Sequence, residues 1–119
     1  MKVKLTLRET DALLVEIKSL LTADVPFLAK YEMREIQRVA LPLVESMLKT
    51  RDEIITQFGV ATEGGFTLQD SEKSDEGVKA IIELLDKEKT ITSDGFEKSA
   101  FEKVSNEYPY EVIFKFIKQ

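Results

Sequence analysis

Strict alternation of apolar and polar side chains opens the chain. Val3, Leu5 and Leu7 are apolar, and the residues between them are lysine or threonine. Because successive side chains of a β-strand point to opposite faces, residues 2–7 are predicted to form a strand with one face buried.

The apolar spacing then changes from two residues to three and four. This spacing places one side of a helix against a core. In the first such segment the apolar residues are Leu13, Leu14, Ile17, Leu20 and Leu21. We expect the helix to end in residues 22–26, where Asp24 can cap a second helix and Pro26 fits its first turn.

The longest amphipathic segment runs from about Pro26 to Phe58. Its apolar stripe is too broad for a strict coiled-coil seam, so we expect it to face a globular core. The stripe consists of Ile36, Ala40, Leu43, Val44, Met47, Leu48, Ile54, Ile55 and Phe58. Pro42 lies inside it and removes one backbone hydrogen bond. The pattern predicts either one kinked helix or two helices that meet near Leu41, with Gly59 as the terminator.

The second half of the chain is divided into shorter segments. Residues 66–68 are predicted to form a short strand after a glycine-containing loop. Apolar residues at helical spacing then predict a helix that ends near Lys89, and residues 90–92 are again strand-prone. From Tyr110 to Ile117 β-branched and aromatic residues predominate, which predicts the strongest strand of the sequence.

Together these elements predict an α+β fold with a single domain over residues 1–119. We expect a helical hairpin with a long, Pro-interrupted helix, packed on a small, mainly antiparallel sheet that includes the N- and C-terminal strands. The composition agrees with this prediction, because 43% apolar and 33% charged residues are typical of a globular domain.

Cysteine and histidine are both absent. Ser-His-Asp and Cys-His nucleophilic systems are therefore excluded, and so are metal sites with histidine or cysteine ligands. Glu72, Asp75 and Glu76 offer oxygen ligands for Mg²⁺ or Ca²⁺, but carboxylates are also favourable at the start of a helix, and we favour this structural role. We expect no enzymatic activity, no catalytic residues, no metal and no cofactor.

The net charge of −5 arises entirely in the second half. Residues 1–60 hold 9 basic and 9 acidic side chains, whereas residues 61–119 hold 8 and 13. Proteins that bind duplex nucleic acid gather positive charge on one surface, so we do not expect a nucleic-acid partner. A solvated acidic surface explains the excess, and an acidic inhibitor that mimics nucleic acid is the alternative.

Basic residues follow one another in the first part of the long helical segment. Arg34 and Arg38 are four residues apart and share a helix face. Lys30, Arg34 and Arg38 are therefore the candidate ligands for a phosphate or another small anion. The alternative is that these cations pair with nearby acidic residues, namely Glu35, Glu45 and Glu53.

The width of the apolar stripe also predicts a protein interface. If the stripe is wider than one small core can cover, the surplus would contact a protein partner or a second copy of the chain as a homodimer. The candidate interface residues are Leu43, Met47, Ile54 and Phe58. No apolar run approaches the roughly 18 residues that a membrane helix needs, so we expect no membrane partner and a cytoplasmic location.

Several segments occur in a recognisable order. A short lysine-alternating opening (Lys2-Val3-Lys4-Leu5) precedes a basic-studded helical middle that closes in Arg51-Asp52-Glu53-Ile54-Ile55. An acidic helix with Ile82-Glu83-Leu84-Leu85 and the strand-prone Thr90-Ile91 follow. This layout resembles a family of small proteins of unknown function that are encoded by tailed phages and prophages of Gram-positive bacteria. The resemblance implies a phage-encoded accessory protein in the host-cell cytoplasm and supplies no catalytic residues.

The leading hypothesis for function is a non-enzymatic accessory protein that acts through protein–protein contacts. The first alternative is a sponge-like protein that binds a small molecule or nucleotide through Lys30, Arg34 or Arg38. The second alternative is an acidic inhibitor that counters host defence.

Overall fold

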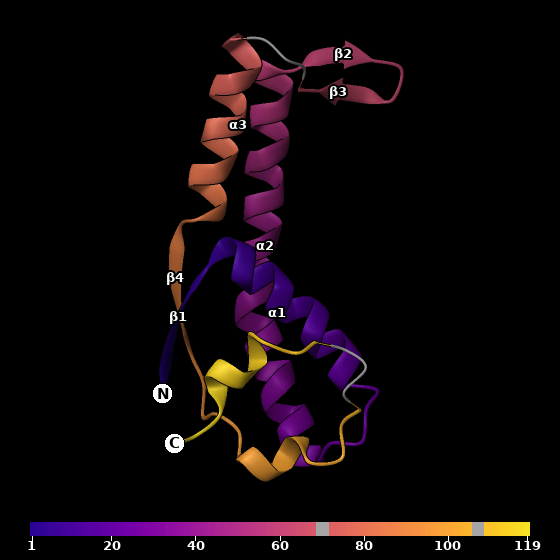
Figure 1. Cartoon of the computed structure of the whole chain (residues 1–119), viewed down its shortest axis with the longest axis vertical. Helices are drawn as coiled ribbons and strands as arrows, with labels where there is room; N and C mark the ends of the chain where they lie inside the picture. The colour runs from indigo at the N-terminus through magenta and orange to yellow at the C-terminus, as the bar shows by residue number, and fades with distance from the viewer. Residues whose placement is uncertain (69–71, 106–108) are drawn as a thin grey trace.

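The computed structural model describes residues 1–68, 72–105 and 109–119, with only the backbone described for Glu72 and Lys73. The molecule is elongated, with extents of 50 × 27 × 20 Å (Figure 1). Its radius of gyration is 17.3 Å, whereas a compact chain of this length has about 13.5 Å. The shape follows from one long helix, along which the other elements are distributed (Figure 1).

An antiparallel pair of strands joins the beginning of the chain to its last third. Strand β1 (Lys2–Thr6) pairs with β4 (Glu88–Thr92), so that Val3 lies opposite Ile91. Leu5 and Ile91 are fully buried, and the residues on either side of each are not, as alternation predicts. The predicted α+β class is therefore confirmed, with a small antiparallel sheet that contains the N-terminal strand.

Helix α1 (Leu7–Leu20) begins directly where β1 ends. The Glu9 N–H donates to the Thr6 hydroxyl, and the Thr6 N–H donates to the Glu9 carboxylate, each at 3.0 Å. This capping box satisfies two N–H groups that a helix start would otherwise leave without a partner. The chain therefore changes from strand to helix at Thr6, and Leu7 begins the helix rather than ending the strand.

Helix α2 (Phe27–Phe58) has 32 residues. At 1.5 Å per residue it is about 48 Å long and spans nearly the whole molecule. Pro42 is exposed and does not divide the helix, so the single-helix alternative is the one that the structure adopts. Gly59 ends the helix as predicted. Pro26 is its N-cap and no side-chain cap forms, so the cap expected from Asp24 is absent.

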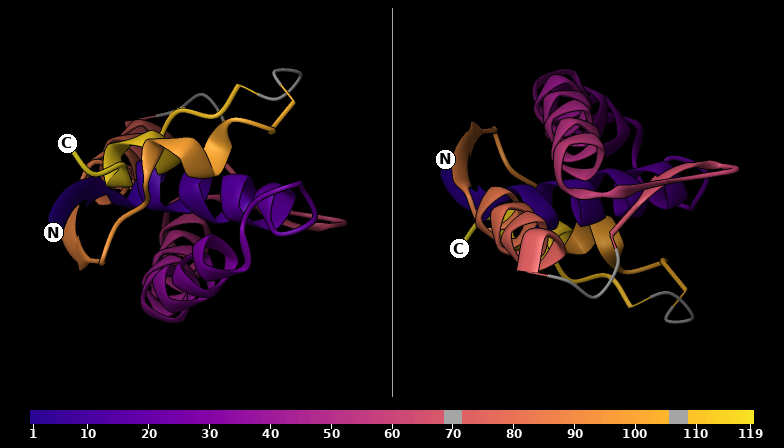
Figure 2. Two further views of the ribbon diagram at one scale, coloured as in Figure 1. Left: turned by 90° about the horizontal axis from the view of Figure 1, so that it is seen from below. Right: turned by 90° about the horizontal axis from the view of Figure 1, so that it is seen from above.

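A hairpin and a third helix form the far end of the molecule. Within the described residues, strands β2 (Val60–Thr62) and β3 (Gly65–Thr67) pair only with each other, and all six of their residues are exposed. Helix α3 (Glu72–Leu85) then returns beside the second half of α2 (Figures 1 and 2). The two helices approach closely, because a Cβ added to Gly77 would lie 2.8 Å from Cβ of Phe58.

The segment from Tyr110 to Ile117 is not a strand, and the prediction of a C-terminal strand is wrong. It contains the short 3₁₀ helix η2 (Ile113–Phe116), which follows another, η1 (Lys98–Phe101). Its last residue forms an isolated parallel bridge with Phe96. The strand that pairs with β1 therefore comes from residues 88–92 instead.

The carboxylate of Glu16 on α1 explains why this segment turns. Glu16 is 4% exposed and accepts hydrogen bonds from the N–H groups of Glu111 (3.0 Å), Val112 (3.2 Å) and Ile113 (3.1 Å). Neighbouring N–H groups of a strand point in opposite directions, so a strand cannot present three in a row to one side chain. The buried carboxylate therefore favours a turn over a strand.

The main core lies where α1, the first half of α2, the β1–β4 sheet and the C-terminal segment meet. Its fully buried members include Leu5, Leu13, Ile17, Leu20, Met33, Ile36, Ile91, Ile113 and Phe116. A second, smaller cluster consists of Leu7, Val44 and Met47. Beyond Met47, none of the remaining residues of α2 is buried. The core therefore ends well before the helix does.

Candidate interaction surfaces

The three predicted anion ligands lie on the first half of α2 in different surroundings. Lys30 is half-buried, and its Nζ lies 5.9 Å from the centroid of the Phe27 ring, within reach of a cation–π contact. Arg34 is exposed. Arg38 forms an ion pair with Glu35 at 3.3 Å, which is one of the pairings that the sequence allowed.

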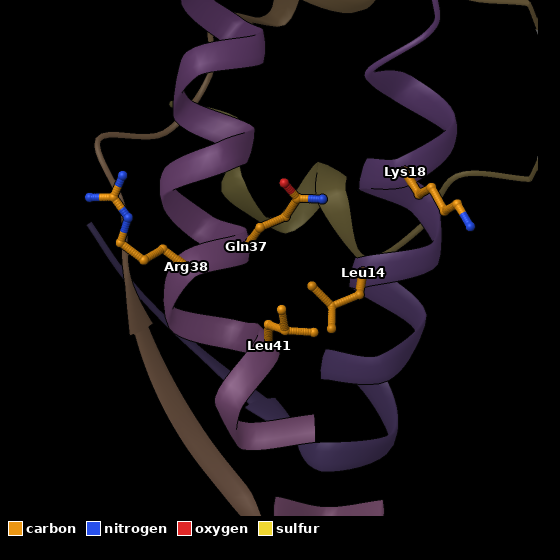
Figure 3. A pocket seen from close by; sticks show the side chains of 5 residues that line it. All are labelled: Leu14, Lys18, Gln37, Arg38 and Leu41. Carbon is orange, nitrogen blue, oxygen red and sulfur yellow. The ribbon is translucent and has the colours of Figure 1, made fainter. Parts of the chain in front are cut away.

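A groove between α1 and α2 is lined by one of these cations, Arg38. It has a volume of about 420 Å³ and is lined by Leu14 and Lys18 from α1 and by Gln37, Arg38 and Leu41 from α2. In Figure 3 the two leucines face each other, while the charged ends of Lys18 and Arg38 point away from the groove in opposite directions. The groove therefore has an apolar floor and does not direct two cations at one anion.

Three large apolar side chains are exposed at the start of α2. Phe27 is 86% exposed, Leu28 is 84% exposed and Tyr31 is 60% exposed. Ala29 and Met33, on the other side of the helix, are buried in the core. Single exposed apolar residues are common on proteins, but three on one helix end form a patch. We call these three residues the α2 patch.

The α2 patch was not predicted, although the sequence contains a signal for it. Phe27 and Tyr31 are four residues apart and share a face. Both are out of phase with the buried positions Ala29, Met33 and, further along, Ile36. Aromatic residues that fall opposite the apolar stripe of a long helix are therefore the feature to look for.

The predicted interface residues lie in the second half of α2 and are partly covered by the chain itself. Met47 is 3% exposed within the second cluster, and Leu43 packs against that cluster. Ile54 and Phe58 are half-buried, and Phe58 lies against Gly77 of α3. The four residues thus contribute to the packing of α3 on α2, and a contact with another chain stays a prediction for them.

Another groove lies over the C-terminal third, with a volume of about 690 Å³. Phe101 lines this groove and makes an edge contact with Phe96 and with Phe114, at 5.6 Å and 5.5 Å between ring centroids. Phe114 is 44% exposed. Phe114 belongs to η2, so the prediction of a strand over this segment did not include its contact with Phe101.

The predicted acidic cluster lies at the start of α3. Asp75 and Glu76 are exposed there, and the side chain of Glu72 lies outside the described part of the chain. Among the described residues, no three acidic side chains are grouped so that they could hold a metal ion. Their position in the first turns of a helix is electrostatically favourable without a ligand.

The pKa of one carboxyl group departs from its ordinary value. Lys115 donates a hydrogen bond to the carboxylate of Glu9, and the Thr6 N–H donates a second one. These contacts, the Lys115 bond above all, lower the pKa of Glu9 below 4.5. The pair fastens η2 to the start of α1, so it stabilises the fold rather than forming a reactive centre.

Comparisons with protein-family models, with curated protein sequences and with solved structures found no match. No helix in the described ranges is long and apolar enough to cross a membrane. The interpretation of function therefore rests on the surfaces of this chain alone.

Proposed function

We propose that this protein is a non-enzymatic accessory protein, of the kind that phages and mobile elements encode, and that it binds another protein through the α2 patch. The observation that carries the proposal is the exposure of Phe27, Leu28 and Tyr31 on one helix end. Aromatic side chains are enriched in protein interfaces because they bury a large area with few rotatable bonds.

The size of the α2 patch supports this role. An aromatic side chain buries about 150–250 Å² of surface, so the three large apolar residues of the patch could bury roughly 400 Å². A stable interface buries about 800 Å² on each partner. The patch would form the centre of such an interface, with the surrounding polar residues as its rim. Lys30 and Arg34 lie beside it, which favours a partner with an acidic rim.

Affinity capture with a matched variant tests the proposal. Wild-type protein and the double variant Phe27→Ser/Leu28→Ser are immobilised and exposed to a bacterial lysate, and the retained proteins are quantified by mass spectrometry. A partner retained by the wild type is then purified and titrated calorimetrically against both proteins. We expect at least about 30-fold weaker binding by the double variant, because two residues at the centre of an interface each contribute more than 1 kcal/mol.

Val39→Ser is the control, since Val39 is an exposed apolar residue of α2 outside the α2 patch. It is expected to bind like the wild type. Equal binding of the partner by the wild type and the double variant would show that the α2 patch is not the binding site. Failure of the wild type to retain any protein would argue against the function itself.

A further inference from the structure

Below the β2–β3 hairpin at the far end of the molecule, two helices run side by side without a core of their own. We call this part the stalk: residues 48–58 of α2 together with α3 (Figure 1). Among its described residues only Ser74 and Gly77 are buried, and neither brings a large apolar side chain. Two helices alone cannot enclose their apolar residues, so helical proteins normally need a third or fourth helix to do so.

Contacts at both ends of the stalk define the seam along which the helices meet. At the far end Gly77 lies against Phe58, and at the near end Leu84 packs on the cluster of Val44 and Met47. Residues at spacings of three and four between these ends complete the seam, since this spacing keeps one helix face toward its partner. The seam residues are Met47, Arg51, Ile54 and Phe58 on α2 and Gly77, Ile81 and Leu84 on α3.

One side of the seam is mainly apolar. In an antiparallel pair, residues that directly follow seam positions lie on the same side in both helices, because turning a helix over preserves its hand. Six such residues lie within the two helices: Asp52 is charged, and the other five, Leu48, Ile55, Val78, Ile82 and Leu85, are apolar. We call these five residues the stalk face. Val78 is 44% exposed and Ile82 is 47% exposed. The other three are half-buried, and Leu48 and Leu85 pack against the second cluster of the same chain.

The other side of the seam is different. The residues that directly precede seam positions are Ser46, Thr50, Glu53, Gln57, Glu76, Ala80 and Glu83. Six of these seven residues are polar or charged, so this side is suited to water. The apolar character of the stalk face is therefore a property of one side, and it is not a general feature of the stalk.

We infer that the stalk face binds a second copy of this chain, so that two stalks form a four-helix bundle around a two-fold axis. The charges that border the face support self-pairing, because they alternate in sign along each helix. On α2 they are Glu45, Lys49 and Asp52, and on α3 they are Asp75 and Lys79. A border with both signs can pair with itself, whereas a partner of one charge sign would meet repulsion at every second position.

The area of the stalk face also fits a second copy. A pair of helices that is about 20 Å long and about 20 Å wide presents roughly 400–600 Å² of surface on one side. Two copies would therefore bury about 1,000 Å², which is near the lower limit for a biological interface. Two-fold dimers are the commonest oligomers, and in them one patch pairs with itself. We expect a reversible dimer with a dissociation constant of about 1–100 µM.

Sedimentation velocity tests the dimer. The wild type is examined from about 1 to about 500 µM, a range that brackets the expected dissociation constant. It should change from monomer to dimer within this range. Ile82→Glu should remain a monomer because it places a charge in the bundle, while Ala80→Glu, on the other side of the same helix, should dimerise like the wild type. A wild-type monomer throughout the range overturns the inference.

Chemical cross-linking keeps the inference testable if Ile82→Glu fails to fold. The chain has no cysteine, so Ile82→Cys and Ala80→Cys each present a single thiol to a short bis-maleimide. We expect covalent dimers of Ile82→Cys and few of Ala80→Cys, and equal yields overturn the inference. The double variant Phe27→Ser/Leu28→Ser should dimerise normally, which separates this inference from the function proposed for the α2 patch.

Discussion

Replacing Glu16 by glutamine alters the buried group that holds the C-terminal segment while leaving its size almost unchanged. Two N–H groups, of Glu111 and Ile113, donate to one carboxylate oxygen, and the Val112 N–H donates to the other. A glutamine oxygen can still accept the first two hydrogen bonds. Its NH₂ group then faces the Val112 N–H, so that two donors meet and this N–H loses its acceptor.

The magnitude follows from these three contacts. Hydrogen bonds to an ionised acceptor are roughly twice as strong as neutral ones, and a buried N–H left without a partner costs about 1–3 kcal/mol. Removing the charge also removes the free-energy cost of burying a carboxylate away from water, which offsets part of the lost stability. The net expectation is that the free energy of unfolding falls by about 2–4 kcal/mol, since bonds to charged groups contribute about 1.5–3 kcal/mol each.

Urea denaturation followed by circular dichroism measures this change, and hydrogen exchange locates it. Faster exchange of the amides of residues 111–113 would show that the segment is released where the carboxylate binds it. Glu53→Gln is the matched control, because Glu53 is exposed on α2 and its replacement should change the free energy of unfolding by less than about 0.5 kcal/mol. A similarly small effect of Glu16→Gln would refute the idea that this side chain fixes the C-terminal turn.

Three further predictions concern single residues. Gly95 has a φ of +78°, and a Cβ there would lie 2.9 Å from the Phe116 carbonyl oxygen, so Gly95→Ala should lower the free energy of unfolding by about 1–3 kcal/mol in urea denaturation. Gly77→Ala gains about 1 kcal/mol of helix propensity, but its Cβ would lie 2.8 Å from Cβ of Phe58. Calorimetry should therefore show a lower Tm for this variant than for the wild type. A higher Tm would mean that α3 is not packed closely on α2. The pKa of Glu9 is lowered by Lys115, so this contact stabilises the fold above pH 4.5 and its contribution is lost as the pH falls through the lowered pKa. Lys115→Met should thus be less stable than the wild type at pH 7, and the difference should shrink in acid; a difference independent of pH would contradict this assignment.

The sequence predicts those parts of the fold in which local pattern and tertiary contact agree. Alternation around Val3 and Leu5 predicts β1 correctly, because one face of that strand is buried. The long amphipathic segment predicts α2, but the pattern alone cannot decide what happens at Pro42. In the structure the helix continues through this position, and Pro42 lies on its exposed side.

The C-terminal segment shows what a pattern of residues cannot predict. Residues 110–117 have strong β-propensity, yet propensity describes how well a residue fits a half-buried pleated surface and does not supply a partner strand. Glu16 is almost 100 positions away in the sequence and offers three backbone N–H groups an acceptor. A buried glutamate on the apolar side of α1 is the available signal, because a buried charge requires several hydrogen-bond donors.

The length of α2 connects the two proposed surfaces. The helix is 32 residues long, whereas the main core and the second cluster cover it only from Ala29 to Met47. Both uncovered ends carry large apolar side chains, and an end that merely extended into solvent would be expected to carry polar ones. At the first end these side chains point away from the core as the α2 patch. At the other end α3 covers one face, and Val78 and Ile82 of the stalk face remain exposed beside the seam. A helix that extends beyond its own core in both directions, and is apolar at both ends, is better suited to join other chains than to enclose a reaction site.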